Sequence, residues 1–214
     1  ELVDILFFGY GKVCNGPFLP GSFAYNEEIK TINQDIEKAK ELLKEAGYDE
    51  NNPFSFEVVT NTGNDIRINA ALILQYQLQK AGIKMNIRVM EWQAFLNTVV
   101  HPRKFEAILL GWSMALMPDA YPIWHSSSAK LGGFNLVSYE NKEVDNLIEK
   151  GNNTINREEL GKIYKEIFKI VTDDLPYLFL YIPDSISAVN KNIKNIEPSF
   201  VGIMHNQKDW EIEE

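Results

Sequence analysis

The spacing of apolar residues predicts a helix followed by a strand early in the chain. Apolar positions recur at helical spacing over residues 36–46, with Asp35 as the expected N-cap and Gly47 as the stop. The run 54–60 is aromatic and β-branched, which is typical of a strand. Residues 1–34 instead combine glycine, proline and aromatics without periodicity, so we expect an extended connector there.

The next segments predict a parallel βαβ unit. Helical spacing recurs from Ile68 to Ala81, and the alternating run 83–89 follows it. Strand, helix and strand in that order predict two parallel strands joined by a right-handed crossover. Residues 91–100 predict a short helix, and 105–110 a buried strand. The fold class is therefore α/β, with a mixed sheet that contains a parallel βαβ unit and has flanking helices.

The last third of the chain predicts two helices and then two strands. Asn141 is the expected cap of the first helix, and Asn156 with Glu159 resembles a capping pair for a helix over about 157–172. The runs 175–182 and 185–190 have the composition of strands separated by a turn.

A long connection rich in aromatic and amide side chains follows the strand at 105–110. It begins at Gly111 and Trp112 and runs with little periodicity to Asn135 and Tyr139. Aromatic and amide groups in a long connection usually serve recognition, and α/β proteins bind ligands at the edge of the sheet to which such a strand leads. This connection is therefore the candidate ligand site.

Composition and charge exclude several classes of protein. The chain has 214 residues, 45% of them hydrophobic and 24% charged, which is ordinary for a soluble globular domain. A net charge of −9 disfavours nucleic acid as a partner. Cys14 is alone, no metal-ligand spacing or cofactor motif occurs, and the residues from Glu1 to Asp4 lack the basic region of a signal peptide. We therefore expect no disulfide, metal, cofactor or membrane span within this sequence.

An ordered series of motifs resembles the C-terminal part of the family 5 extracellular solute-binding proteins of ABC transporters, which include oligopeptide- and dipeptide-binding proteins. The carriers of the resemblance are residues 35–48, Ala81-Gly82-Ile83, Glu91-Trp92, Gly111-Trp112-Ser113, Pro118-Asp119, Tyr139-Glu140-Asn141 with Asp145, and Asp174-Leu175-Pro176-Tyr177. Each motif alone is weakly specific, and the series in this order is strong.

The resemblance implies one lobe of a clamshell-shaped, periplasmic-binding-protein-like protein. Intact members have several hundred residues and a first lobe that this chain lacks, so a fragment is expected. Residues 35–182 would form the ligand-binding lobe, 1–34 a hinge or connector, and 183–214 the hinge return and a tail toward the missing lobe. The ligand would lie between the two lobes.

The same resemblance implies the ligand site. The candidate residues are Trp112, Ser113, Asp119, Tyr121, Asn135, Tyr139, Asn61 and Thr62. Relatives that bind a peptide's amino group have an aspartate where this chain has Ala115, and Asp119 is the possible replacement. Some relatives have an arginine near Asn61, and without one carboxylate binding is weakened. A purely structural role is the alternative for each residue: Trp112 as a core aromatic, Asp119 as a turn residue, and the others as packing residues.

The function expected is capture of a peptide or similar small solute and its delivery to a membrane permease, in the periplasm or on the outer face of a bacterial membrane. A binder of a metal complex, haem or a sugar within the same family is the alternative. The members of a hydrolase triad are superficially present in His125, in the adjacent Ser126, Ser127 and Ser128, and in Asp119 upstream, but no nucleophile-elbow motif accompanies them. An enzyme is therefore not expected. A chaperone-like interaction domain has no dedicated signal.

Overall fold

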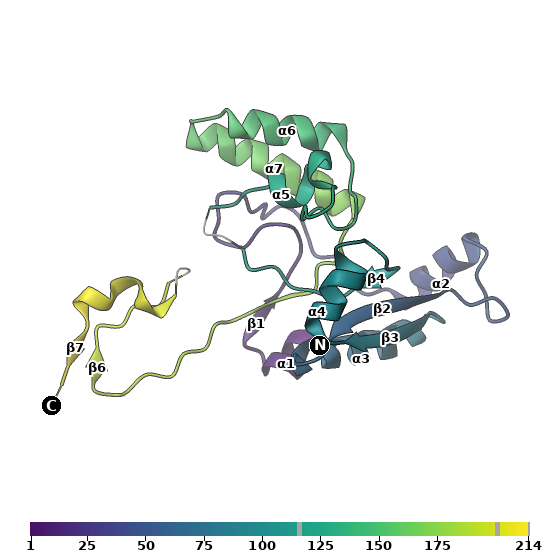
Figure 1. Ribbon diagram of the computed structural model, residues 1–214, viewed down its shortest axis with the longest axis horizontal. Coiled ribbons are helices and arrows are strands. Elements are labelled where there is room, and N and C mark those ends of the chain that lie inside the picture. The colour runs from purple at the N-terminus through teal and green to yellow at the C-terminus, as the bar shows by residue number, and fades with distance from the viewer. Residues whose placement is uncertain (115–116, 200–201, 214) are drawn as a thin grey trace.

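A three-stranded parallel sheet forms one half of the molecule (Figure 1). The computed structural model describes residues 1–114, 117–199 and 202–213. Strand β2 (Ser55–Asn61) lies between β3 (Lys84–Met90) and β4 (Ala107–Ile108), and it is parallel to both. The predicted α/β class with a parallel βαβ unit is confirmed. Antiparallel pairing occurs only in separate two-stranded pairs among the described residues.

Helices cover both faces of this sheet. Helix α3 (Asp65–Gln79) joins β2 to β3, and Ala70 and Ala71 pack with Val58 in one core cluster. Val59 points to the opposite face, where it packs with residues of α4 (Trp92–Phe95) and of the π-helical turn η1 (Leu96–Val100). Successive strand residues face opposite sides, and the burial of both Val58 and Val59 shows that the two faces of β2 are covered. Helix α2 (Ile36–Glu45) begins at Asp35, as predicted.

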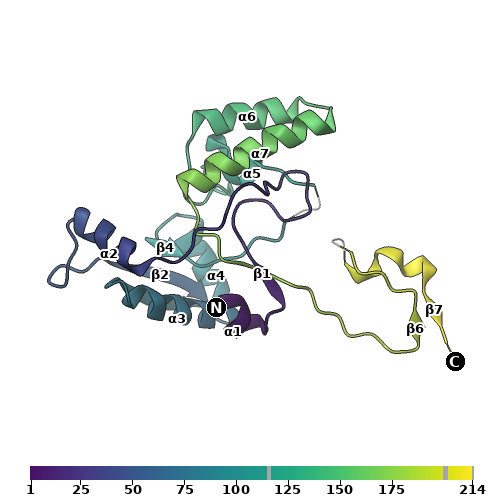
Figure 2. The same cartoon turned by 180° about the vertical axis from the view of Figure 1, so that it is seen from behind.

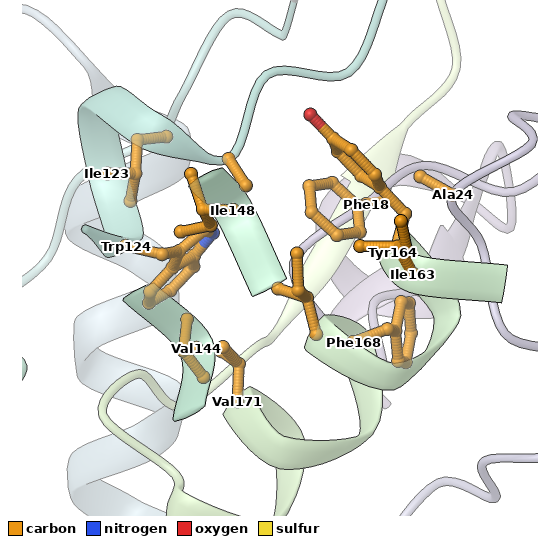
Figure 3. Packing of buried hydrophobic residues seen from close by; sticks show 12 residues of the cluster. Phe18, Ala24, Ile123, Trp124, Val144, Ile148, Ile163, Tyr164, Phe168 and Val171 are labelled. Atoms are coloured by element: carbon orange, nitrogen blue, oxygen red, sulfur yellow. The ribbon is translucent and has the colours of Figure 1, made fainter. Parts of the chain in front are cut away.

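The other half of the molecule is helical. Helices α6 (Lys142–Asn152) and α7 (Arg157–Asp174) lie side by side with the short α5 (Tyr121–Trp124) and the 3-10 turn η2 (Ser126–Ser128) beside them (Figures 1 and 2). Asn141 and Asn156 cap α6 and α7 as predicted, each accepting two backbone N–H bonds. Figure 3 shows their core, in which Trp124, Ile148 and Phe168 pack together.

The connector predicted over 1–34 is only partly extended. Residues Leu2–Phe7 form helix α1, which the sequence analysis missed because glycine residues follow it closely. Leu2 and Leu6 pack against the core cluster under the sheet, and the ring of Phe7 lies 4.9 Å from that of Tyr181. Tertiary packing therefore stabilises a helix of six residues that would be marginal alone.

Two strands join the halves of the molecule. Strand β1 (Gly11–Val13) pairs antiparallel with β5 (Tyr181–Pro183). Between β1 and α2 the chain wraps against α7, where Phe18 and Ala24 enter the helical core and Asn26 donates to the carbonyl of Lys165 at 3.1 Å. The predicted connector is thus also a structural part of the helical half.

Three of the predicted strands are shorter in the structure than expected or are absent from it. Leu175 ends α7 in a left-handed conformation with φ of 48°, and only the end of the run 175–182 pairs, as β5. Residues 185–190 form no strand, and the run 105–110 pairs only over β4. Strand propensity is expressed only where a neighbouring strand completes the hydrogen bonds, and 185–190 has no such neighbour.

The described residues of the C-terminal segment beyond β5 extend away from the rest of the molecule (Figures 1 and 2). They carry the short pair β6 (Ile193–Lys194) and β7 (Glu211–Ile212), linked through the 3-10 segment η3 (Ile203–Asp209). Asn206 holds this unit together, because its amide bonds the backbone of Asn195 and Glu197 and the indole of Trp210. Within the described ranges, no helix is both long and apolar enough to cross a membrane.

Candidate functional site

The carboxyl ends of the parallel strands gather one group of the expected site residues. Asn61 is the last residue of β2, Thr62 follows it, and Trp112 lies just beyond β4. The backbone N–H of Thr62 donates to the carbonyl of Met90 at 2.7 Å, which ties the end of β2 to the end of β3. This is the edge at which α/β proteins bind ligands, so the structure brings these three residues to a suitable place.

Arg67 completes this edge, although it was not among the expected residues. Its backbone N–H is held by the Asn64 cap of α3 at 2.9 Å, and its guanidinium donates through Nη1 to Oδ1 of Asn61. Nη2 lies 3.7 Å from the position that a Cβ at Gly111 would take. The expectation that no arginine lies near Asn61 was therefore wrong. The first turn of α3 brings back to the strand end a side chain that lies six residues away in sequence.

The surroundings of Arg67 disfavour its charged form. Partial burial lowers the pKa of its guanidinium, and the nearby phenol of Tyr181 acts in the opposite direction. Burial in turn raises the pKa of Tyr181, and the positive charge of Arg67 opposes that rise. No ion pair among the described residues includes Arg67.

Trp112 lies at the surface and not in a core. Its side chain is 39% exposed, and its ring meets the ring of Phe134 edge-on at 5.9 Å and 87°. The indole also hydrogen bonds to Tyr177, whose pKa is raised to about 12 by burial and held back by that bond. Phe134, 55% exposed, was missed by the sequence analysis, although its place after Gly132 and Gly133 could have indicated an exposed loop tip.

Ser113 and Asp119 lie in the connection that leaves this edge. Ser113 is exposed next to Trp112. Asp119 is also exposed, and its Oδ1 accepts the backbone N–H of Tyr121 at 3.0 Å, the bond expected of an aspartate in a turn. Ala115, the position of the aspartate in peptide-binding relatives, lies outside the described residues.

Tyr121 belongs to a polar cluster at α5. Its ring stacks on that of His125 at 4.3 Å, and its hydroxyl lies 2.8 Å from Oγ of Ser127. The backbone N–H of Ser127 donates to Nδ1 of His125 at 3.1 Å. Nδ1 of His125 also lies 2.8 Å from Oγ of Ser127 and 3.8 Å from Oδ1 of Asp145, which accepts from Ser126, and Nε2 lies 3.5 Å from Oε1 of Glu149. Asp119, the acid of the superficial triad, accepts from the N–H of Tyr121 instead.

Asn135 and Tyr139 shape the end of the connection. Asn135 is fully buried, and its amide donates to the carbonyls of His125 and Tyr139 at 3.2 and 2.8 Å and accepts from the N–H of Tyr139 at 2.8 Å. The hydroxyl of Tyr139 donates to Asp174 at 2.5 Å, and burial together with that carboxylate raises the pKa of Tyr139. Both side chains thus bond within the chain and close a loop.

Six of the eight expected residues therefore fall into two groups, while Ser113 and Asp119 lie in the connection between them. Asn61, Thr62 and Trp112 lie at the carboxyl edge of the sheet, whereas Tyr121, Asn135 and Tyr139 belong to the helical half. Trp124 lies between the groups, because its ring packs 4.8 Å from that of Tyr177, the partner of Trp112. Among the described residues, no group of three or more His, Cys, Asp or Glu is placed to hold a metal ion.

Comparison with known proteins decides which family this architecture represents. The family of bacterial extracellular solute-binding proteins, family 5 Middle, matches residues 1–134. The chain belongs to this family. The matched range contains the whole parallel sheet and the Gly111-Trp112 edge.

Several family 5 relatives are similar over nearly the whole chain. The oligopeptide-binding protein AppA of Bacillus subtilis is 32% identical over 98% of this chain and 41% of its own length. Its structure in complex with a nonapeptide superposes with a TM-score of 0.84, covering 100% of this chain and 45% of that one. DppA of Helicobacter pylori, solved in complex with the peptide STSA, has 27% identity and a TM-score of 0.82, covering 99% of this chain and 41% of its own.

The family 5 relatives also include proteins named for other solutes. The nickel-binding protein NikA of Staphylococcus aureus is 28% identical over 94% of this chain and 40% of its own length. The chain thus spans less than half the length of each of these relatives. Solute binding, and not catalysis, is what their names describe.

Proposed function

We propose that this chain is the ligand-binding lobe of a family 5 solute-binding protein that captures a peptide and delivers it to the membrane permease of an ABC transporter. The observation that carries the proposal is the sheet edge at which Arg67 bonds Asn61 and lies 3.7 Å from the place of a Cβ at Gly111, the residue before the partly exposed Trp112. An exposed aromatic ring beside amide and guanidinium donors suits a ligand with both apolar side chains and peptide carbonyls.

A peptide is the favoured solute because two of the similar relatives have been solved with peptides bound. AppA and DppA were both solved with peptides, and the chain covers 41% of the length of each. An extended peptide offers carbonyl and N–H groups along its length, which suit the amide of Asn61 and the guanidinium of Arg67 at this edge.

A second lobe would complete the site. The proposed division is a hinge segment at 1–34, the ligand-binding lobe at 35–182 and a return to the other lobe at 183–214. Strands β1 and β5 suit a hinge, because they form a short antiparallel pair where the chain enters and leaves the proposed lobe. Ile186 and Ile212 are 75% and 79% exposed in the extended C-terminal segment, which fits a segment whose apolar side chains are covered by another domain.

A non-peptide solute is the second candidate. Relatives named for nickel and for haem align with 94% and 83% of this chain. The described residues place no set of three metal ligands together, so a metal would have to arrive as a complex with an organic chelator or be bound by other parts of the protein. The periplasm or the outer face of a bacterial membrane is the compartment that either candidate implies.

A binding experiment on the two-lobed protein tests the proposal. Isothermal calorimetry with a tetrapeptide library, nickel–histidine complex and haem compares the candidates directly. Peptide binding with a dissociation constant well below that of the other two supports the proposal. Binding of only the nickel complex or haem selects the second candidate, and affinity for none of the three contradicts both. The 214-residue chain alone is expected to bind weakly, because a clamshell gains affinity by burying its ligand on both sides.

A further inference from the structure

The loop at residues 130–135 carries an exposed aromatic ring beside a buried stretch of chain. Phe134 is 55% exposed. Asn135, the next residue, is fully buried, and Leu136 after it packs in the core cluster that contains Val59. The backbone on the C-terminal side of Phe134 is therefore anchored in the interior, while its ring remains in solvent.

Arg103 fixes both ends of this loop. Its Nη2 donates to the carbonyl of Lys130 at 2.8 Å and to the carbonyl of Asn135 at 3.2 Å. A single guanidinium group thus bridges the residue that begins the loop and the residue that ends it. Because the guanidinium is planar and presents its donors in a fixed arrangement, the two carbonyls are held at a set separation.

Residue 133 has to be glycine for the loop to follow this path. A Cβ at Gly133 would overlap the carbonyl oxygen of Ser128. The N–H of Gly133 donates to the carbonyl of Lys130 at 2.8 Å, which closes a tight turn immediately before Phe134. The ring is therefore carried by a backbone that is held on both sides, so a ligand that covers the ring costs little additional ordering of the loop.

The ring of Phe134 enlarges the aromatic surface of Trp112. The two rings meet edge-on, with centroids 5.9 Å apart and planes at 87°. Both remain accessible after this contact, Trp112 with 39% of its surface exposed. Trp112 follows Gly111, which lies beside Arg67 at the carboxyl edge of the sheet. The aromatic pair is thus continuous with the candidate ligand site.

We propose that Phe134 is a specificity-determining residue that, together with Trp112, binds an apolar side chain of the captured peptide. This inference rests on the proposed function and names the class of side chain that the same site selects. An apolar side chain that covers the two rings removes apolar surface from water, whereas a polar side chain in that place loses its hydrogen bonds to water. The alternative occupant is the second lobe, which would cover the rings whatever the sequence of the peptide.

The test measures the affinity of the two-lobed protein for two tetrapeptide libraries by calorimetry. The apolar library carries leucine, isoleucine, valine and phenylalanine at its four positions, and the polar library carries serine, threonine, asparagine and glutamine. Wild-type protein is expected to bind the apolar library about tenfold or more tightly than the polar one. Phe134→Ala is expected to lose about tenfold in affinity for the apolar library and to bind the polar library as the wild type does.

Three results would overturn the inference alone. Unchanged affinity of Phe134→Ala for the apolar library shows that the ring does not contact the ligand. An equal loss for both libraries assigns the ring to the second lobe. A wild-type protein that binds the two libraries equally has no preference for Phe134 to determine. Wild-type protein that binds neither library contradicts the proposed function instead, so the two failures are distinguishable.

Matched variants separate the ring from the loop that carries it. Leu131→Ala truncates another apolar side chain of the same loop, one that is 82% exposed, and it is expected to retain the wild-type preference. An equal loss of preference in Leu131→Ala would overturn the assignment to Phe134. Phe134→Tyr keeps the ring and should retain the preference, whereas Phe134→Gln replaces the ring with a polar chain and should lose it. If Phe134→Ala does not fold, as judged by thermal unfolding, Phe134→Gln provides the same comparison.

Discussion

The aromatic ring of Phe168 occupies the space that a side chain at Gly16 would need. A Cβ built on Gly16 would overlap the ring atoms of Phe168, which is fully buried at the centre of α7. The chain that follows β1 can therefore pass over α7 only because residue 16 has no side chain. This contact attaches the N-terminal segment to the helical core.

Substitution of Gly16 should consequently weaken the fold. Gly16→Ala forces Phe168 or the backbone to move, and overpacking of this kind costs about 1–3 kcal/mol of unfolding free energy. Urea unfolding followed by circular dichroism measures it. Gly161→Ala is the control, because its Cβ would lie 3.6 Å from the nearest atom outside its own helix and alanine is the better helix former. Equal stability of Gly16→Ala and wild type would contradict the packing described.

Trp112 and Trp124 should respond oppositely to truncation. Trp112 is 39% exposed, so Trp112→Ala should cost about 1–3 kcal/mol of binding free energy in the two-lobed protein and change its stability little. Trp124 is 2% exposed, and Trp124→Ala should lower the free energy of unfolding by about 3–5 kcal/mol. Calorimetry and thermal unfolding of the same variants measure both effects. A large stability loss in Trp112→Ala would assign that residue to packing.

Asp119 is expected to act through its turn. Asp119→Asn keeps the acceptor for the N–H of Tyr121 but removes the charge, so both stability and ligand affinity should remain within error of the wild type. Binding measured at low and high salt checks this. If affinity falls at low salt and the difference shrinks at high salt, Asp119 instead binds a cationic group of the ligand.

We expect Asn135 to contribute to the stability of the fold and not to contact the ligand directly. Asn135→Leu removes the partner of the buried carbonyl of His125 and of the partly buried carbonyl and N–H of Tyr139, so we expect a loss of about 1–3 kcal/mol in unfolding free energy. Asn153→Leu serves as the control, since that amide makes a single exposed bond to Glu149. Lower affinity with unchanged stability in Asn135→Leu would favour direct contact with the ligand.

Alkaline pH should destabilise the protein through Tyr177. Its pKa is raised to about 12 in the folded state, whereas the unfolded phenol titrates near its ordinary value of 10.0. The folded state therefore retains a proton that the unfolded state releases, and the associated stability is complete below pH 10 and is lost as the pH rises toward 12. Unfolding of wild type and Tyr177→Phe across this range measures the effect. Identical pH dependence of the two proteins would exclude it.

Local sequence signals predicted most of the regular elements between residues 35 and 182. Asp35, Asn141 and Asn156 begin their helices as expected, because a cap needs only a side-chain oxygen within three residues of the N–H groups it accepts. The aromatic and β-branched residues of the run 54–60 predicted strand β2, and the order of strand, helix and strand predicted its parallel partner. The same order of elements placed Trp112 and Asn61 at the carboxyl edge of the parallel strands, because each lies at or beyond the end of a predicted strand.

Only the tertiary structure decided the features that depend on residues distant in sequence. The strand predicted over 185–190 lacks a neighbour to pair with, while the six-residue α1 exists because Leu2 and Leu6 pack beneath the sheet. Asn135 looked like a ligand group, but folding turns its amide toward His125 and Tyr139. Arg67 was overlooked because a first helical turn brings its guanidinium back to Asn61. A sequence pattern reports which face a residue occupies, whereas the partner that its polar atoms find depends on three-dimensional packing.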